Sequence, residues 1–178
     1  REMTQTKIMK RYAAELIKQT PWAILPDSLR GMLEIAERHN ADPEAIAASL
    51  GRPLQNTRNV TVRDGVAIVP VNGPIFRYAN LFTEISGATS LEILATDFAQ
   101  AVDNPDVHFI VLEIDSPGGQ ATGISEFAEL IRSAPKPVIA YVDGLAASAA
   151  YWLASAADEI AGSKTAMVGS IGAVIGID

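Results

Sequence analysis

The fold is indicated most clearly by residues 107–119, Val-His-Phe-Ile-Val-Leu-Glu-Ile-Asp-Ser-Pro-Gly-Gly. Residues 107–114 form a near-continuous apolar run with the length of a buried strand, and a glycine turn follows it. A second apolar run, residues 138–142, leads into Gly-Leu-Ala-Ala-Ser-Ala-Ala-Tyr at 144–151. Apolar residues at helical spacing precede both runs, at 91–102 and 124–131. This alternation of helices and strands predicts an α/β fold with a parallel sheet.

Shorter elements are expected around this core. Two runs rich in valine flank Asp64-Gly65, a dipeptide that favours a tight hairpin because both residues tolerate positive φ. Residues 75–89 show no clear period and predict a long connection. The remaining expectations are a small-residue helix at 146–156 and short strands at 159–161 and 171–177.

The N-terminal part reads differently from the rest. Residues 3–50 show helical spacing and no strand alternation, and three prolines divide them into short helices, namely Pro21, Pro26 and Pro43. Asp27 or Ser28 is expected to cap the second of these helices. We therefore expect a helical N-terminal appendage and linker over residues 1–59 and a core domain over residues 60–178.

Composition limits the classes of function. The chain has 178 residues, 48% of them hydrophobic, which is enough for one core. Its net charge is −7 and uneven: residues 1–64 hold ten Lys/Arg against eight Asp/Glu, whereas residues 65–178 hold four against thirteen. The net negative charge of residues 65–178 disfavours nucleic acid as a ligand of this part of the chain, because phosphate binding needs clustered cations. The absence of cysteine and of a long apolar run predicts no membrane span and a cytoplasmic location.

Both glycine- and alanine-rich motifs follow strands, and open α/β sheets bind ligands at the carboxyl ends of their strands. Gly118 and Gly119 offer amides that no Cβ obstructs. Ser148 offers a hydroxyl among small alanines, where a helix is expected to begin. An oxyanion formed there would be held by the amide of Ala149 with that of Gly118 or Gly119, each donor typically worth about 3 kcal/mol. Each motif alone predicts only packing or a turn, but the pair favours acyl chemistry.

A nucleophilic serine needs a base, and the residues present supply no well-placed one. His108 begins the strand that ends at Asp115, so at about 3.3 Å per residue it lies roughly 20 Å from the active end. His39 belongs to the helical appendage. Lys136 precedes its strand, at the wrong end, and Lys164 falls in a polar turn. Two distant histidines and no cysteine predict no metal site, and no cofactor is expected.

Residues 66–178 resemble the signal peptide peptidase A family, serine-lysine peptidases of the ClpP/crotonase superfold. Three motifs in order carry the resemblance: Ile-Asp-Ser-Pro-Gly-Gly at 114–119, Ala-Ser-Ala-Ala-Tyr-Trp at 147–152, and Val-Gly-Ser-Ile-Gly at 168–172. The resemblance implies a ClpP/crotonase-like parallel sheet flanked by helices. It also implies roles for five residues: Ser148 as nucleophile, Gly118 or Gly119 with Ala149 as oxyanion hole, and Ser170 as the serine that orients the lysine.

The chain departs from that family in two places. Where many members have Ser-Gly-Gly, this chain has Ser148-Ala149-Ala150, which keeps the required amide. The family's general-base lysine lies well downstream of the Gly-Ser-Ile-Gly motif, whereas this chain stops at Asp178. We therefore expect a fragment of a longer protein, in which a later segment or a neighbouring subunit brings the lysine. The histidine of ClpP-type chemistry is not expected, because no histidine follows Ser148.

Two further segments, residues 20–26 and 80–87, resemble tailed-phage and prophage head-maturation proteases. This resemblance implies cleavage of scaffold and capsid proteins inside a procapsid, in the host cytoplasm. The resemblance to the signal peptide peptidase A family also implies a ring-like homo-oligomer. Three alternatives stay open. They are a cellular peptidase that degrades signal peptides at the membrane, a crotonase-like acyl-thioester enzyme that needs no nucleophilic serine, and a non-catalytic assembly module.

Overall fold

A β-hairpin opens the central sheet. The computed structural model describes residues 21–38, 60–78 and 88–173. In it, β2 (Thr61–Arg63) pairs antiparallel with β3 (Val66–Asn72). Asp64 and Gly65 turn the chain with φ angles of 49° and 79°, the left-handed region that a tight hairpin needs. The hairpin predicted from this dipeptide is confirmed.

The central sheet has six strands and is mostly parallel. Its order is β10-β8-β6-β3-β2, and β9 pairs with the first half of β8. The remaining strands of this sheet are β6 (Phe109–Ser116), β8 (Val138–Ala147), β9 (Glu159–Gly162) and β10 (Met167–Gly169). Every pair other than the hairpin runs parallel. The predicted α/β class with a parallel sheet is therefore confirmed.

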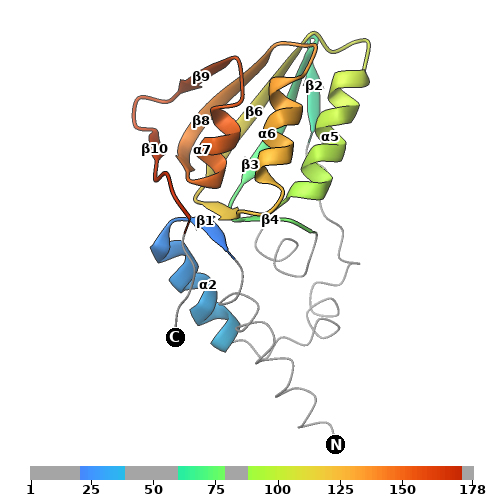
Figure 1. Ribbon diagram of the computed structural model, residues 1–178. Helices are drawn as coiled ribbons and strands as arrows, with labels where there is room; N and C mark the ends of the chain where they lie inside the picture. The colour runs from blue at the N-terminus through green and yellow to red at the C-terminus, as the bar shows by residue number, and fades with distance from the viewer. Residues whose placement is uncertain (1–20, 39–59, 79–87, 174–178) are drawn as a thin grey trace, which may run out of the picture.

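A second, four-stranded sheet forms beyond the carboxyl ends of β3 and β6, in the order β1-β7-β4-β5. Its strands are β1 (Trp22–Ile24), β4 (Ile75–Phe76), β5 (Thr89–Ser90) and β7 (Gly118–Gln120). This sheet lies across the lower end of the central sheet in Figure 1, with α2 (Pro26–Arg38) below it. The small sheet thus borders the rim where ligands are expected.

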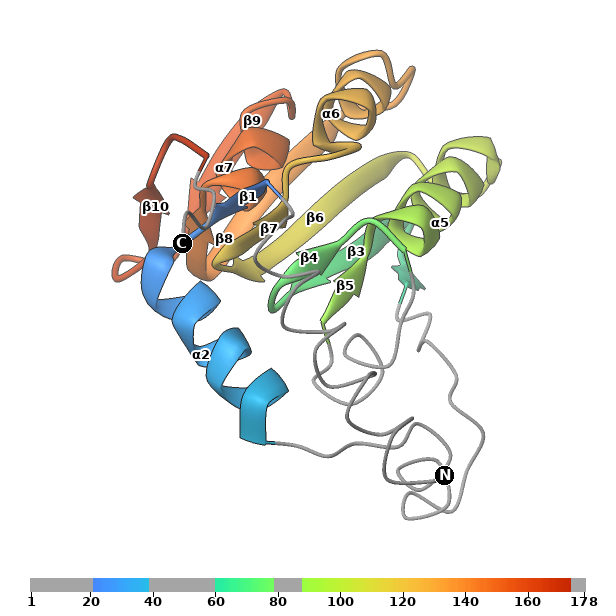
Figure 2. The ribbon, with the colours of Figure 1, turned by 60° about the horizontal axis from the view of Figure 1, so that its bottom comes forward.

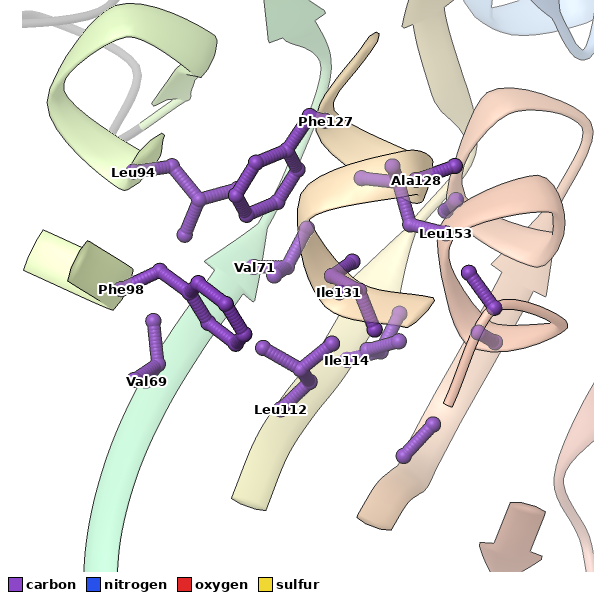
Figure 3. Packing of buried hydrophobic residues seen from close by; sticks show 14 of the residues in the cluster. Val69, Val71, Leu94, Phe98, Leu112, Ile114, Phe127, Ala128, Ile131 and Leu153 are labelled. Carbon is purple, nitrogen blue, oxygen red and sulfur yellow. The ribbon is translucent and has the colours of Figure 1, made fainter. Parts of the chain in front are cut away.

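Three helices cover one face of the central sheet, and the views in Figures 1 and 2 show them in a row. They are α5 (Leu91–Asp103), α6 (Ile124–Arg132) and α7 (Ala149–Ala154). Alternate residues of β6, namely Ile110, Leu112 and Ile114, are fully buried beneath them. Phe98 of α5 and Phe127 of α6 meet edge to face above the strands, with ring centroids 5.6 Å apart (Figure 3). This core fixes the strands whose ends carry the motifs.

The expectation of helices alone over residues 3–50 is wrong at residues 22–24, which form β1. Three residues are too few to show a strand period, and this strand exists because β7 supplies its hydrogen-bond partners. The second helix begins at Pro26, so neither Asp27 nor Ser28 is its N-cap. Proline suits a first helical turn, where its missing N–H costs nothing. The helices expected at residues 3–20 and 39–50, and Pro43 with them, lie outside the described residues.

Other bounds shift where tertiary pairing overrides local pattern. β4 and β5 lie at the two ends of the expected 75–89 connection. The strand expected at 107–114 runs from 109 to 116, and the helices near 91–102 and 124–131 are confirmed. The helix expected from residue 146 starts at Ala149, because β8 continues to Ala147 beside β6 and β10. The strand expected at 171–177 is absent at 171–173, and residues 174–178 lie outside the described part.

Candidate active site

The turn after β6 is built around the hydroxyl of Ser116. This fully buried side chain donates to the carbonyl of Gly73 over 2.6 Å and accepts the N–H of Gly118 over 3.2 Å. Gly118 has φ 97°, a conformation that suits glycine because it lacks a Cβ. Ser116 thus holds the glycine turn against the turn that follows β3. Nothing in the motif at residues 114–119 indicates this role for Ser116, because the carbonyl of Gly73 that it binds is 43 positions away in sequence.

The end of β8 is shaped by the carboxylate of Asp115. The register between β6 and β8 shifts between Ile114 and Ser116, so that β8 carries extra residues at this point. The Oδ1 of Asp115 accepts the N–H of Leu145 over 3.1 Å, inside that irregularity. β8 then resumes pairing with Ser116 opposite Ala146. This local bulge sets where β8 ends, and therefore where Ser148 lies.

Ser148 stands between β8 and α7 in a strained backbone conformation, with φ 54° and ψ −114°. These angles mirror an ordinary extended conformation and are costly for a residue with a side chain. Its N–H donates to the carbonyl of Gly169 over 2.8 Å, and its Oγ donates to the carbonyl of Gly172 over 2.9 Å. The residue is 6% exposed. Ser148 is therefore placed on a sharp strand-to-helix turn, with its hydroxyl toward the loop after β10.

Ser170 lies in that same loop, between the two glycine carbonyls that bind Ser148. It has φ 54° and its side chain is exposed. Gly169, next to it, pairs in parallel with Ala147 of β8. The structure thus brings the backbone of Ser170 beside Ser148, although the two residues are 22 positions apart in sequence.

The glycine turn and the first residue of α7 meet at one place. A Cβ built on Gly118 would lie 3.1 Å from the nitrogen of Ala149 and 2.8 Å from the carbonyl oxygen of Ala147. The N–H of Ala149 lies in the first turn of α7, where the helix itself provides no acceptor. Gly119 pairs with Ala23 of β1. The predicted site residues therefore converge on one rim, where main-chain amides gather beside a hydroxyl.

The candidate bases do not join them. The main-chain N–H of His108 donates to the carbonyl of Gly65, so this residue lies at the hairpin end of the sheet. The ammonium of Lys136 binds the carbonyls of Ala101 and Asn104, at 3.1 and 2.6 Å. Since β8 separates Lys136 from Ser148, about ten residues at 3.3 Å each place them roughly 30 Å apart. Lys164 lies in the exposed turn between β9 and β10, and His39 is outside the described residues.

Comparison with known proteins gives several relatives. A head-tail preconnector protein GP5 of Enterobacteria phage P21 is 34% identical over 76% of this chain and 27% of its own length. The capsid assembly protease C of Escherichia phage lambda is 32% identical over 68% of this chain and 28% of its own length. Protease 4 of Salmonella typhi is 34% identical over 60% of this chain and 17% of its own length. The chain thus spans about a quarter or less of the length of these relatives.

Among solved structures, a probable enoyl-CoA hydratase from Mycobacterium thermoresistibile aligns with a TM-score of 0.49. It is 23% identical over 62% of this chain and 51% of that chain. Over the described ranges, no helix combines the length and apolar character that crossing a membrane requires. Residues 131–177 match Peptidase family S49, a segment that contains both Ser148 and Ser170. The predicted resemblance to serine peptidases is confirmed: residues 131–177 match the model of Peptidase family S49, and proteases of phage lambda and Salmonella typhi are 32% and 34% identical to this chain.

Proposed function

We propose that the protein is a serine endopeptidase whose nucleophile is Ser148 and whose base is a lysine. The observation that carries the proposal is the convergence at this residue. A strained strand-to-helix turn presents the hydroxyl, and the amide that follows it lies against the glycine turn of the preceding strand. The S49 match over residues 131–177 supports the same reading.

In the proposed reaction, the neutral lysine amine takes the proton of the Ser148 hydroxyl while Oγ attacks the carbonyl carbon of a peptide bond. The amide of Ala149, with that of Gly118 or Gly119, stabilises the oxyanion, and each such donor is typically worth about 3 kcal/mol. The lysine then protonates the leaving amine as the C–N bond breaks, which leaves an ester on Ser148. Water hydrolyses this ester and restores the serine.

Ser170 is proposed to orient that lysine through its hydroxyl. Its support is its place in the loop that also binds the N–H and Oγ of Ser148. Neither Lys136 nor Lys164 lies at the site, so the mechanism draws its lysine from outside the described residues. A lysine amine is neutral near pH 7 only where burial lowers its pKa.

The biological role that we propose is cleavage of scaffold and capsid proteins during phage procapsid maturation, in the host cytoplasm, by a homo-oligomer. Two phage relatives named for capsid or head-tail assembly align over 76% and 68% of this chain. Protease 4 of Salmonella typhi aligns over 60% of it. The likeness therefore extends further along the chain for the phage proteins, which favours this role over a cellular one.

The test replaces Ser148 with Ala in the full-length protein and measures cleavage of an unfolded protein substrate and labelling by a fluorophosphonate. We expect both to be lost while the far-UV circular dichroism is kept. The matched control is Ser155→Ala, since Ser155 is an exposed serine at the end of the same helix whose hydroxyl binds Trp152. This control should keep both activities. Retained proteolysis in Ser148→Ala would refute the assignment, and a crotonase-like enzyme would show no labelling at Ser148.

A further inference from the structure

The strand β1 is paired with the glycine turn of the candidate site. β7 has two edges, and β4 holds one of them in parallel, with Ile75 opposite Gly119. β1 holds the other, antiparallel, with Trp22, Ala23 and Ile24 opposite Gln120, Gly119 and Gly118. Figure 2 shows β1 beside β7 near the start of α7. Among the described residues, the edge that β1 covers is therefore the edge of β7 that an incoming strand would have to use.

The register directs one carbonyl into the turn. Leu25 N–H bonds to the Pro117 carbonyl, and Ala121 N–H bonds to the Pro21 carbonyl, both at the outer ends of the pairing. Hydrogen-bonded and non-hydrogen-bonded pairs alternate in an antiparallel ladder, so the pair between these two is also hydrogen-bonded. The N–H of Gly119 therefore faces the carbonyl of Ala23.

The same carbonyl lies close to the other amide of the site. A Cβ built on Gly118 would overlap the Ala23 carbonyl oxygen, and the Ala149 nitrogen lies only 3.1 Å from that position. The Ala23 carbonyl thus lies where an amide of the glycine turn and the amide after Ser148 come together. A peptide carbonyl under attack by Ser148 would need this neighbourhood.

The side chains of β1 alternate between two environments. Trp22 and Ile24 are buried with Phe76, and the rings of Trp22 and Phe76 meet edge to face with centroids 5.8 Å apart. Ala23 points to the opposite side and joins the main core. The edge of β7 therefore receives a large apolar side chain, then a small one, then a large one.

We propose that β1 occupies, in cis, the strand edge on which the peptide substrate pairs. In this arrangement residues 22–24 imitate a bound substrate, block its entry, and must leave before a peptide binds. Extended peptides commonly bind by adding a strand to a sheet edge, where main-chain bonds give affinity and alternate side chains give specificity. The pattern of β1 then defines the preferred substrate: alanine at the residue whose carbonyl faces the amides, flanked by large apolar residues. This inference rests on the proposed peptidase function.

The test locks β1 in place with a disulfide. Trp22 and Gln120 form a non-hydrogen-bonded pair, whose Cα atoms lie about 4.5 Å apart in an antiparallel ladder, within the range of a disulfide. The chain has no cysteine of its own, so Trp22→Cys with Gln120→Cys gives a single possible bond. Oxidised and reduced forms of this double variant have one sequence, so substitution damage is equal in both. The two single variants, which cannot form the intramolecular bond, control for the reducing agent.

The readout is binding of a fluorescein-labelled peptide that copies residues 20–26, Thr-Pro-Trp-Ala-Ile-Leu-Pro, in the Ser148→Ala background so that nothing is cut. The peptide keeps the tryptophan side chain that β1 lacks in the Trp22→Cys variant. It should therefore displace β1 from β7 once the disulfide is reduced. We expect the reduced protein to bind at least tenfold more tightly than the oxidised protein. Equal binding within twofold, including no binding by either form at 1 mM peptide, would overturn the proposal.

Cleavage is measured separately in the double variant with Ser148 intact. We expect oxidation to slow proteolysis at least tenfold and reduction to restore it. Equal rates in the two forms would count against blocking by β1. If instead Ser148→Ala still cleaves substrate, the proposed function fails while the peptide-binding comparison still decides whether β1 covers a peptide edge. The two failures are therefore distinguishable.

Discussion

Replacing Ser148 with glycine should remove the nucleophile and stabilise the fold relative to alanine. The residue has φ 54° and ψ −114°, the mirror image of a common extended conformation. Glycine, which lacks a Cβ, adopts mirror-image conformations about as readily as the ordinary ones. Alanine keeps the Cβ and therefore keeps the strain. The two inactive variants thus differ chiefly in whether the backbone strain at the turn is relieved.

The size of the effect follows from three terms. Strain of this kind costs about 1–3 kcal/mol. Glycine also lowers the free energy of unfolding by about 0.4–1 kcal/mol, because it raises the conformational entropy of the unfolded chain. Both variants lose the bond from Ser148 Oγ to the Gly172 carbonyl, about 1 kcal/mol, so this term cancels between them. Ser148→Gly should therefore be more stable than Ser148→Ala by about 1 kcal/mol, or roughly 2–4 °C in Tm for a chain of this size.

Urea denaturation followed by circular dichroism measures this difference. The matched control is Ala150→Gly, because Ala150 lies two residues later, inside α7, and its φ is not positive. There glycine should destabilise by about 1 kcal/mol, as in any helix. If Ser148→Gly proved no more stable than Ser148→Ala, the strained turn would be refuted as a property of this residue.

Three further predictions concern other positions in the fold. Gly119→Ala should lower the free energy of unfolding by about 2 kcal/mol or more, because the added Cβ would overlap the Ile75 carbonyl. Gly31→Ala, which has open space around it, should raise the free energy of unfolding by about 1 kcal/mol. Urea titrations of the two variants measure these changes. Lys136→Met should cost about 1–2 kcal/mol by removing two bonds to carbonyls, yet leave fluorophosphonate labelling unchanged. Ser125→Ala should raise the pKa of Glu126 toward its ordinary value, because the Ser125 hydroxyl is the main cause of its lowering. A lowered carboxyl pKa adds stability above the unfolded pKa that is lost as pH falls through the folded pKa, so the variant should lose stability near neutral pH and not in acid. An unchanged Glu126 titration by NMR would contradict this cause.

Much of the site was predictable because its motifs follow strands. Residues 107–114 and 138–142 are apolar runs of strand length between helical patterns, and parallel strands bring their carboxyl ends to one rim. Ser148, Ala149 and Gly118 were therefore expected to lie near one another, and they do. The sequence also predicted that Lys136 lies far from Ser148, because Lys136 precedes the strand that ends beside Ser148. Their catalytic roles remain predictions.

The parts that were missed depend on partners distant in sequence. Nothing in Trp22-Ala23-Ile24 shows a strand period, and β1 forms because β7 offers it an edge. Likewise, the Asp115 carboxylate holds a bulge whose position is set by two strands together. Ordering the backbone in these places costs conformational entropy, and only hydrogen bonds to distant segments offset that cost. A local sequence pattern therefore does not predict them.

By itself, the sequence determined the α/β class, the hairpin at Asp64-Gly65, the alternation of α5, β6, α6 and β8, and the three motifs that resemble those of serine peptidases, because each rests on local period, turn chemistry or residue identity. Only the tertiary structure decided that Ser148 is strained, that the loop at residues 169–172 binds it, and that β1 covers the glycine turn. The physical reason is that backbone amides and carbonyls are the same in every residue. Which of them meet is fixed by register and packing between distant segments.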